Sequence, residues 1–421
     1  MTSKPALVPV AAAAVLFGAV AAVIWFTTPW QPFGEIPIDP VAPDVDRDFS
    51  SAEQAAANEY AARIRPPALL GIGLAVAGSA VLGFTPLGAR IVTAAGRLGG
   101  GRWPAQVVFG GVAVLLAVRL LTLPTAAWAE SVRRSQGLST RDWGEFALDV
   151  VRGFGVSAVG ALVALLMLVG LARWVRRLWW VMAAGAAAGL VVLVSFVYPL
   201  VVEPVFNQFT PLKDGELRTS LVEMAERDGV AVDEVLEADA SRRTTTLNAY
   251  VSGFGATHRI VVYDTLLAEA GDDEIRSVVA HELGHTAEND VRNGTLLGAL
   301  AAAGAVCALA ALLRWKPLLR RSGASGPGDP RVVPLLLALA TIAGLVASPV
   351  ESLVSRQIEA RADVHALELT QDAETFIELQ RALALSSYRD LDPPPLLHVW
   401  FASHPTTPER IALARTWEQL N

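Results

Sequence analysis

The sequence predicts a mainly α-helical, polytopic membrane protein that carries a small α+β region. The chain is 53% hydrophobic and only 18% charged, with a mean hydropathy of +0.42. Several apolar stretches reach the ~20 residues that a helix needs to cross a bilayer. Polar segments with helix and strand patterns follow some of these stretches. A chain of 421 residues could form two or three soluble domains, but this composition argues against that organisation.

Seven apolar stretches are predicted to span the membrane. They occupy about 6–28, 67–86, 104–124, 153–172, 179–200, 294–313 and 332–350. The third contains Arg119, whose charge either extends to the interface or faces a polar interior. A cleaved signal peptide is the alternative for the first stretch, but its apolar core is too long and no convincing cleavage site follows.

The connecting loops predict the orientation of the spans. Loops 87–103, 173–178 and 314–331 carry eleven basic residues against one acidic residue, Asp329. With seven spans these loops fall on the same side, which the positive-inside rule makes cytoplasmic. We therefore expect a multi-pass protein of the cell membrane whose larger polar regions, and any chemistry in them, are extracytoplasmic.

This pattern divides the chain into four parts. Residues 1–200 form an N-terminal membrane region with five spans and the polar loop 29–66, and residues 294–350 hold the last two spans. The polar regions 201–293 and 351–421 are the only places for soluble chemistry. They contain patterns of helices at 216–228, 351–369 and 372–385 and from Pro408, and of strands at 232–238, 245–254 and 259–263.

Two features of the composition exclude classes of site. Cys307 is the only cysteine in the sequence, so the chain forms neither an intramolecular disulfide nor a cysteine-based metal site. The net charge of −7 gives no indication of nucleic-acid binding.

The run VAHELGH at 279–285 is the most informative motif in the sequence. Histidines four residues apart lie on one side of a helix, so His281 and His285 can bind one zinc ion. Glu282 can take a proton from a zinc-bound water. The alternative is a helix with two surface histidines. Acidic residues at 272–274, which offer an N-cap and a negative first turn, and an apolar stripe favour a packed helix.

A zinc peptidase needs a third protein ligand and leaves one position for water. Glu359 is the best candidate, because it lies on a predicted helix just beyond the last span. Asp363 lies one turn further on the same face, and its carboxylate can accept the free N–H of a ligating histidine. The alternative for both residues is a charged, solvated helix face.

Five separated motifs in a fixed order give the sequence a family resemblance. They are 204–212 (PVFNQFTPL), 248–250 (NAY), 281–285 (HELGH), 355–363 (SRQIEARAD) and 403–405 (SHP). In this order they resemble the type I CAAX prenyl proteases, zinc membrane endopeptidases that process prenylated proteins. The resemblance is close over about 199–415, whereas the N-terminal spans are similar only in number and hydropathy.

The resemblance implies a role for each motif. His281, His285 and Glu359 would bind one zinc ion per chain, and Asp363 would support a ligand. Glu282 would act as general base and then as proton donor to the leaving amine. The resemblance also implies a fold, in which seven helices enclose a water-filled chamber with a zincin-like catalytic domain on its wall.

The resemblance also implies that four further residues contact the substrate. His404 and Arg410 would stabilise the oxyanion or hold substrate carbonyls. Asn248 and Ala249 would lie on an edge strand that pairs with an extended substrate, where main-chain hydrogen bonds give affinity with little side-chain selectivity.

We therefore expect a membrane zinc endopeptidase that acts on peptide or protein substrates, prenylated or membrane-embedded, in the lipid bilayer. One alternative is a heat-shock-type quality-control protease that degrades membrane proteins. A second is a non-catalytic scaffold or channel, which the intact ligand and base residues argue against. A transporter is disfavoured because the sequence lacks repeat symmetry and broken pairs of spans.

Overall fold

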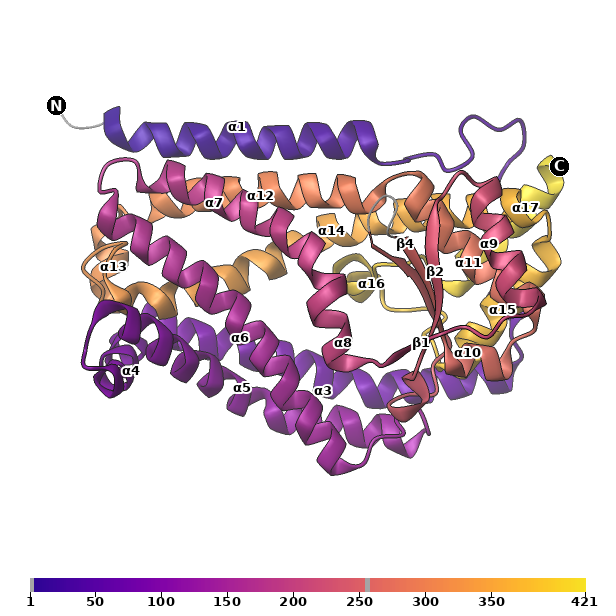
Figure 1. Ribbon diagram of the computed structural model, residues 1–421, viewed down its shortest axis with the longest axis horizontal. Helices are drawn as coiled ribbons and strands as arrows, with labels where there is room; N and C mark the ends of the chain where they lie inside the picture. Colours follow the sequence, from indigo (N-terminus) through magenta and orange to yellow (C-terminus); the bar gives the residue numbers. More distant parts are fainter. Residues whose placement is uncertain (1–3, 254–257) are drawn as a thin grey trace.

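Seven long apolar helical segments run side by side in the part of the chain that the computed structural model describes, residues 4–253 and 258–421 (Figure 1). They are α1 (Lys4–Thr27), α3 (Ser51–Phe84), α5 (Trp103–Ser135), α6 (Trp143–Trp174), α7 (Trp179–Val197), α12 (Asp290–Leu312) and α14 (Val333–Thr370). The π-helical turn Tyr198–Val202 and α8 (Glu203–Phe206) prolong α7. The predicted fold class and the number of spans are confirmed.

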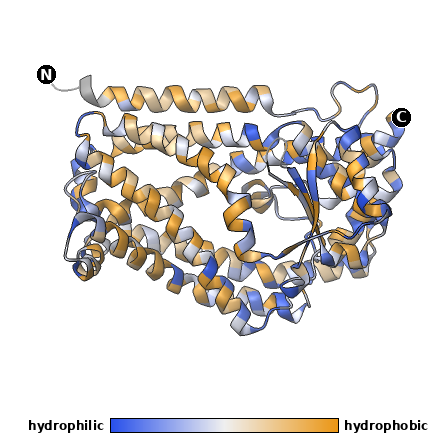
Figure 2. Ribbon diagram, in the orientation of Figure 1, coloured by the Kyte–Doolittle hydropathy of each residue, from blue (hydrophilic) through white to orange (hydrophobic). Residues whose placement is uncertain are grey.

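The long helices consist mainly of hydrophobic residues, and hydrophilic residues gather around the sheet and in the loops at the opposite end (Figure 2). Helix α1 packs against α12, and Val15 on α1 is 72% exposed. Such exposure of large apolar groups is unfavourable in water but fits a helix that faces lipid.

Several helices extend well beyond the predicted spans. Helix α3 begins at Ser51, because Ser50 and Glu53 exchange hydrogen bonds that cap its first turn, including Ser50 N–H to Glu53 Oε2 at 2.7 Å. Helix α14 is 38 residues long and joins the last span to the helix predicted separately over 351–369. The continuity of α14 places Glu359 and Asp363 on the same rigid element as a membrane span.

The three basic loops lie together at one end of the bundle. Short helices occur there: α4 (Pro86–Gly96), η1 (Arg97–Gly99), α13 (Lys316–Ser322) and η5 (Pro330–Val332) (Figure 1). Arg173 Nη1 donates to Gly328 O at 2.8 Å, which links two of these loops directly. The loops therefore share a side, as expected, while the assignment of that side to the cytoplasm stays a prediction.

The opposite end carries a four-stranded mixed sheet with the order β1-β2-β4-β3. Its strands are β1 (Phe209–Pro211), β2 (Val232–Ala238), β3 (Ala249–Ser252) and β4 (His258–Tyr263). Strands β2 and β4 are parallel, and the other two pairs are antiparallel, so β3 is an edge strand. The predictions for β2 and β4 agree with the structure; β3 is shorter than the predicted 245–254, whose Phe254 lies outside the described residues, and β1 was not predicted.

Among the described residues, eight short helices complete this end of the molecule. They are α2 (Val45–Asp48), α9 (Glu216–Arg227), η3 (Ala240–Arg242), α10 (Asp264–Glu269), α11 (Asp272–Ala287), α15 (Ala373–Ser386), α16 (Pro395–Phe401) and α17 (Thr407–Leu420). Helix α11 packs between β3 and α14, and of its predicted apolar stripe Ile275, Val279 and Leu283 are buried while Val278 is partly buried. The division of the chain into four parts stays a prediction.

Candidate metal centre

Helix α11 carries the HELGH motif and has well-defined ends. Its N-cap is Gly271, one residue before the predicted position, and the Gly271 N–H donates to Glu274 Oε2 at 2.8 Å. The helix ends at Ala287, and Asn289 adopts a left-handed conformation (φ 58°) that turns the chain into α12. This turn brings the start of α12 back toward His285.

The structure brings His281, His285 and Glu359 together. Their ligand atoms all lie within 4.8 Å of one another. His281 Nε2 lies 3.3 Å from His285 Nε2 and 3.2 Å from Glu359 Oε2, and His285 Nε2 lies 3.8 Å from Glu359 Oε1. Donor atoms placed ~2.0–2.1 Å from a tetrahedral zinc ion are about 3.3 Å apart. The three side chains therefore fit the spacing of a zinc site.

Each histidine contacts a carboxylate through its other ring nitrogen. His281 Nδ1 lies 2.9 Å from Asp363 Oδ1, and His285 Nδ1 lies 2.9 Å from Asp290 Oδ2. An Nδ1–H that donates to a carboxylate leaves the Nε2 lone pair free for a metal and raises the basicity of the ring. Asp363 was expected from the sequence, whereas Asp290 was not.

Arg410 on α17 reaches the same group of residues. Its guanidinium donates to both oxygens of Asp363, at 2.5 and 2.8 Å, and both residues are buried. The structure thus places Arg410 beside the carboxylate that contacts His281, and Arg410 also lines the cavity described below.

His404 approaches from the segment between α16 and α17. Its Nε2 lies 3.3 Å from Glu359 Oε2, and its Nδ1 lies 2.9 Å from Ser403 Oγ. Arg356 on α14 fixes this segment by donating to Ala402 O at 2.7 Å and to His398 O at 3.1 Å. Helix α16 was not predicted, because its proline-rich start reads as a turn.

A cavity of about 100 Å³ opens beside the candidate ligand His281. Its lining includes His281, Glu282, His404, Arg410 and Asn248. Ala249 follows Asn248 as the first residue of β3, where it is buried and opposite Val262 of β4. The fold therefore brings residues of α11, of the segment before β3 and of the C-terminal part of the chain to one small space.

Burial shifts the ionisation of two of these side chains. It raises the pKa of Glu282, although the neighbouring His281 and His285 act in the opposite direction. It lowers the pKa of His404, although the charge of Glu359 opposes the shift. A raised pKa makes Glu282 a stronger proton acceptor than an exposed glutamate.

Hydrogen bonds connect the segment before the edge strand β3 to the turn between the membrane helices α5 and α6. Thr140, in the turn between α5 and α6, donates its hydroxyl to Ser241 O at 2.8 Å. Thr244 Oγ1 donates in return to Leu138 O at 3.2 Å. These bonds fix the segment that leads into Asn248 and β3.

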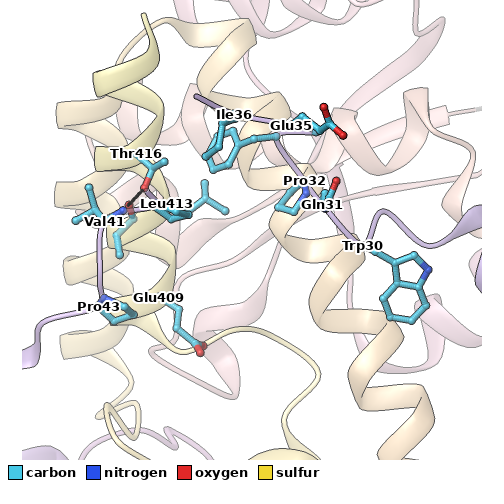
Figure 3. A pocket seen from close by; sticks show the side chains of 14 residues that line it. Trp30, Gln31, Pro32, Glu35, Ile36, Val41, Pro43, Glu409, Leu413 and Thr416 are labelled. Carbon is cyan, nitrogen blue, oxygen red and sulfur yellow. Dashed lines mark hydrogen bonds between the residues drawn. The ribbon is translucent and has the colours of Figure 1, made fainter. Parts of the chain in front are cut away.

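A larger cavity of about 740 Å³ lies elsewhere, between α17 and the loop that follows α1 (Figure 3). This loop lies across α17, and the Val41 N–H donates to Thr416 Oγ1 at 2.9 Å. The smaller cavity, in contrast, is lined by Asn248, His281, Glu282, His404 and Arg410 of the predicted site, so size alone does not identify the site.

Two family models match the chain. Residues 211–418 match peptidase family M48, and residues 76–208 match the family described as CAAX prenyl protease N-terminal, five membrane helices. The chain is 32% identical over 305 residues to a Bacillus subtilis (strain 168) protein named uncharacterized metalloprotease YhfN, with 72% of each chain covered. The chain belongs to peptidase family M48.

Other proteins resemble it over different lengths. CAAX prenyl protease 1 of Saccharomyces cerevisiae is 30% identical over 240 residues, and the match spans about half of either chain, 52%. The crystal structure of S. mikatae Ste24p superposes with a TM-score of 0.74 at 21% identity, covering 98% of this chain and 99% of that one. This likeness shows the same fold.

The M48 membership establishes the class of activity. The chain is a zinc metalloendopeptidase, a hydrolase with a multi-pass membrane region, and the resemblance to the CAAX prenyl proteases is confirmed. The scaffold, channel and transporter alternatives are therefore set aside.

Proposed function

We propose that this M48 protein hydrolyses peptide bonds with a water molecule activated at one zinc ion per chain, held by His281, His285 and Glu359. The convergence of two imidazole nitrogens and a carboxylate oxygen, at separations of 3.2–3.8 Å, carries this proposal. Zinc bound there would polarise the substrate carbonyl and lower the pKa of a bound water to about 7.

The protein groups around that position supply the remaining steps. Glu282 lines the cavity and, once ionised, takes the proton from the attacking water and passes it to the leaving amine. His404 and Arg410 line the same cavity, where hydrogen bonds from their side chains would stabilise the negative charge that develops on the carbonyl oxygen. Asp363 and Asp290 keep the two histidines in the ligating tautomer.

The edge strand indicates how the substrate binds. Strand β3 pairs with β4 on one side and is at the edge of the described sheet on the other. An extended peptide can add to this edge through main-chain hydrogen bonds, with Asn248 and Ala249 next to the scissile bond. The relatives named CAAX prenyl protease 1 support a prenylated or membrane-embedded protein as the substrate, and the loop charges support an extracytoplasmic site.

The test compares zinc content and peptide cleavage for the detergent-purified wild type and Glu282→Gln. Glu368→Gln is the matched control, because Glu368 is exposed on α14. Substrates are a farnesylated CAAX peptide and its unprenylated form. We expect one zinc per chain in all three proteins, and chelator-sensitive cleavage in the wild type and the control, reduced ~10²–10⁴-fold in Glu282→Gln. Equal cleavage by Glu282→Gln would rule out the assigned base.

A further inference from the structure

A cavity of about 340 Å³ lies among the basic loops, at the end of the molecule opposite the sheet (Figure 1). Three arginines from three short elements line it: Arg90 on α4, Arg97 on η1 and Arg331 on η5. None of the described residues that line it is acidic. The proposed mechanism uses none of these arginines, so this positively charged cavity needs a separate explanation.

Two of the three arginines have no partner in the protein. Arg90 and Arg97 are seven residues apart, about two helical turns, and Thr93 between them lines the same cavity. Both arginines are exposed, and within residues 4–253 and 258–421 neither guanidinium forms an ion pair or a hydrogen bond. Two uncompensated positive charges therefore border one space.

Arg331 differs, because it pairs with Asp329. Its Nη2 donates to Asp329 Oδ2 at 2.6 Å, and its Nε donates to Asp329 Oδ1 at 3.0 Å. The backbone N–H and the hydroxyl of Ser325 also donate to Asp329 Oδ2, at 2.9 and 2.7 Å. Asp329 is the one acidic residue in the three basic loops. Its carboxylate is thus used by Arg331 and Ser325, which leaves Arg90 and Arg97 uncompensated.

Close packing of two backbone segments forms one wall of the cavity. Gly323 follows α13 in a left-handed conformation (φ 79°), which favours glycine. A Cβ atom at Gly323 would lie 2.9 Å from the Ala89 Cβ on α4, so the turn after α13 packs directly against α4. The shape of the cavity therefore depends on the packing of short helices and not only on the arginine side chains.

The surroundings of the cavity indicate the level of the lipid headgroups. Helix α4 packs against α5, which begins at Trp103, and nearby helices at this end begin or end at Trp179 and Trp174. Tryptophans collect at the interface between membrane and water. Leu98, directly after Arg97, is 80% exposed. Exposed leucine beside exposed arginine is typical of a segment that lies in this interface.

We propose that this cavity binds the phosphate group of an anionic membrane lipid through Arg90 and Arg97. Guanidinium groups match phosphate oxygens with paired, charge-assisted hydrogen bonds. The Thr93 hydroxyl borders the same space. The predicted orientation agrees with such a ligand, since the positive-inside rule places the basic loops at the leaflet that is rich in anionic lipids. A free phosphate ion offers the same oxygens, but the tryptophans and exposed Leu98 favour a lipid.

The experiment measures lipid binding to the detergent-purified full chain by native mass spectrometry, with phosphatidylglycerol, phosphatidylcholine and inorganic phosphate as separate ligands. Arg90→Gln/Arg97→Gln should bind phosphatidylglycerol ~30-fold more weakly than the wild type, because each arginine near an anionic lipid contributes about fivefold. Arg320→Gln/Arg321→Gln is the matched control. It removes the same charge from exposed positions on α13 at the same end, outside the cavity lining, and should keep the wild-type affinity.

Two further measurements keep the result interpretable. All variants should retain the wild-type thermal unfolding midpoint and peptide cleavage in lipid-free detergent, because the cavity is remote from the metal centre. Arg90→Lys/Arg97→Lys keeps the charge without the planar fork and should retain part of the affinity.

A loss of phosphatidylglycerol binding that is confined to the Arg90 and Arg97 variants supports the inference. Equal losses in Arg90→Gln/Arg97→Gln and in the Arg320 and Arg321 control would overturn it, because the general charge of this end would then attract the lipid. Equal affinity of the wild type for phosphatidylcholine, or for inorganic phosphate, would also overturn the assignment to an anionic lipid.

Discussion

The carboxylate of Asp363 lies between Arg410 and His281 and contacts both. Arg410 donates to it at 2.5 and 2.8 Å, and His281 Nδ1 lies 2.9 Å away. Asp363 is on α14 and Arg410 is on α17, so the last helix of the chain is connected through one carboxylate to a candidate metal ligand on α11. The orientation of His281 therefore depends on packing between helices that are far apart in the sequence.

Asp363→Asn should weaken both zinc binding and the fold. Zinc affinity should fall ~10–100-fold because the amide is a weaker acceptor for the His281 N–H. The free energy of unfolding should fall by about 3–5 kcal/mol, since Arg410 would be left buried without its partner. Chelator competition and thermal unfolding in detergent measure the two effects. Asp214→Asn is the control, because the Asp214 side chain is 98% exposed, and an equal response of the two variants would contradict this role of Asp363.

Asp290→Asn tests the partner that sequence reasoning missed. Asp290 lies between His285 Nδ1, at 2.9 Å, and Arg361 Nη2, at 2.6 Å. We expect zinc affinity to fall ~10–100-fold, with activity recovering at saturating zinc because the ligands themselves remain. Asp273→Asn on the exposed first turn of α11 should leave zinc affinity unchanged. Wild-type affinity in Asp290→Asn would show that Asp290 does not support His285.

Glu359→Gln should remove most of the bound zinc. The two histidine ligands are neutral, so the Glu359 carboxylate supplies the only negative charge among the three ligands, and an amide oxygen does not replace it. Elemental analysis of the purified variant gives the zinc content directly. Glu368→Gln, nine residues further along the same helix and exposed, should retain one zinc per chain. A full complement of zinc in Glu359→Gln would mean that another residue is the third ligand.

The parts of the fold that follow from local periodicity could be predicted from the sequence. The apolar spans, strand β2 and the side shared by His281 and His285 depend on residue spacing within one element. Asp290 could not be found in this way, because its contact with His285 depends on the left-handed turn at Asn289. The sequence nevertheless contains an indication of this turn, because Asp290 follows an asparagine directly and lies five residues after His285.

Arg389, in the turn after α15, lines the small cavity but is not among the residues expected from the sequence. Its neighbours in the sequence indicate only a polar turn, and its place beside His404 and Glu282 results from the packing of α15 against α11 and α17. The long α14 is an intermediate case. Its two halves were predicted correctly, but their continuity was not, because the change from apolar to charged residues near Glu351 reads as a boundary.

The pH dependence of cleavage should report the ionisation of Glu282. A general base must be deprotonated, so kcat/KM falls as the pH drops through its pKa. Burial raises that pKa, which moves the acid limb of the profile above the ~4.3 of an exposed glutamate.

The measurement is kcat/KM against pH for the wild type and for the residual activity of Glu282→Gln, with zinc content checked at each pH. The limb should be absent from the variant, because its amide does not titrate. An acid limb at or below the value of an exposed glutamate, or one that persists in Glu282→Gln, would assign the proton transfer to a different group.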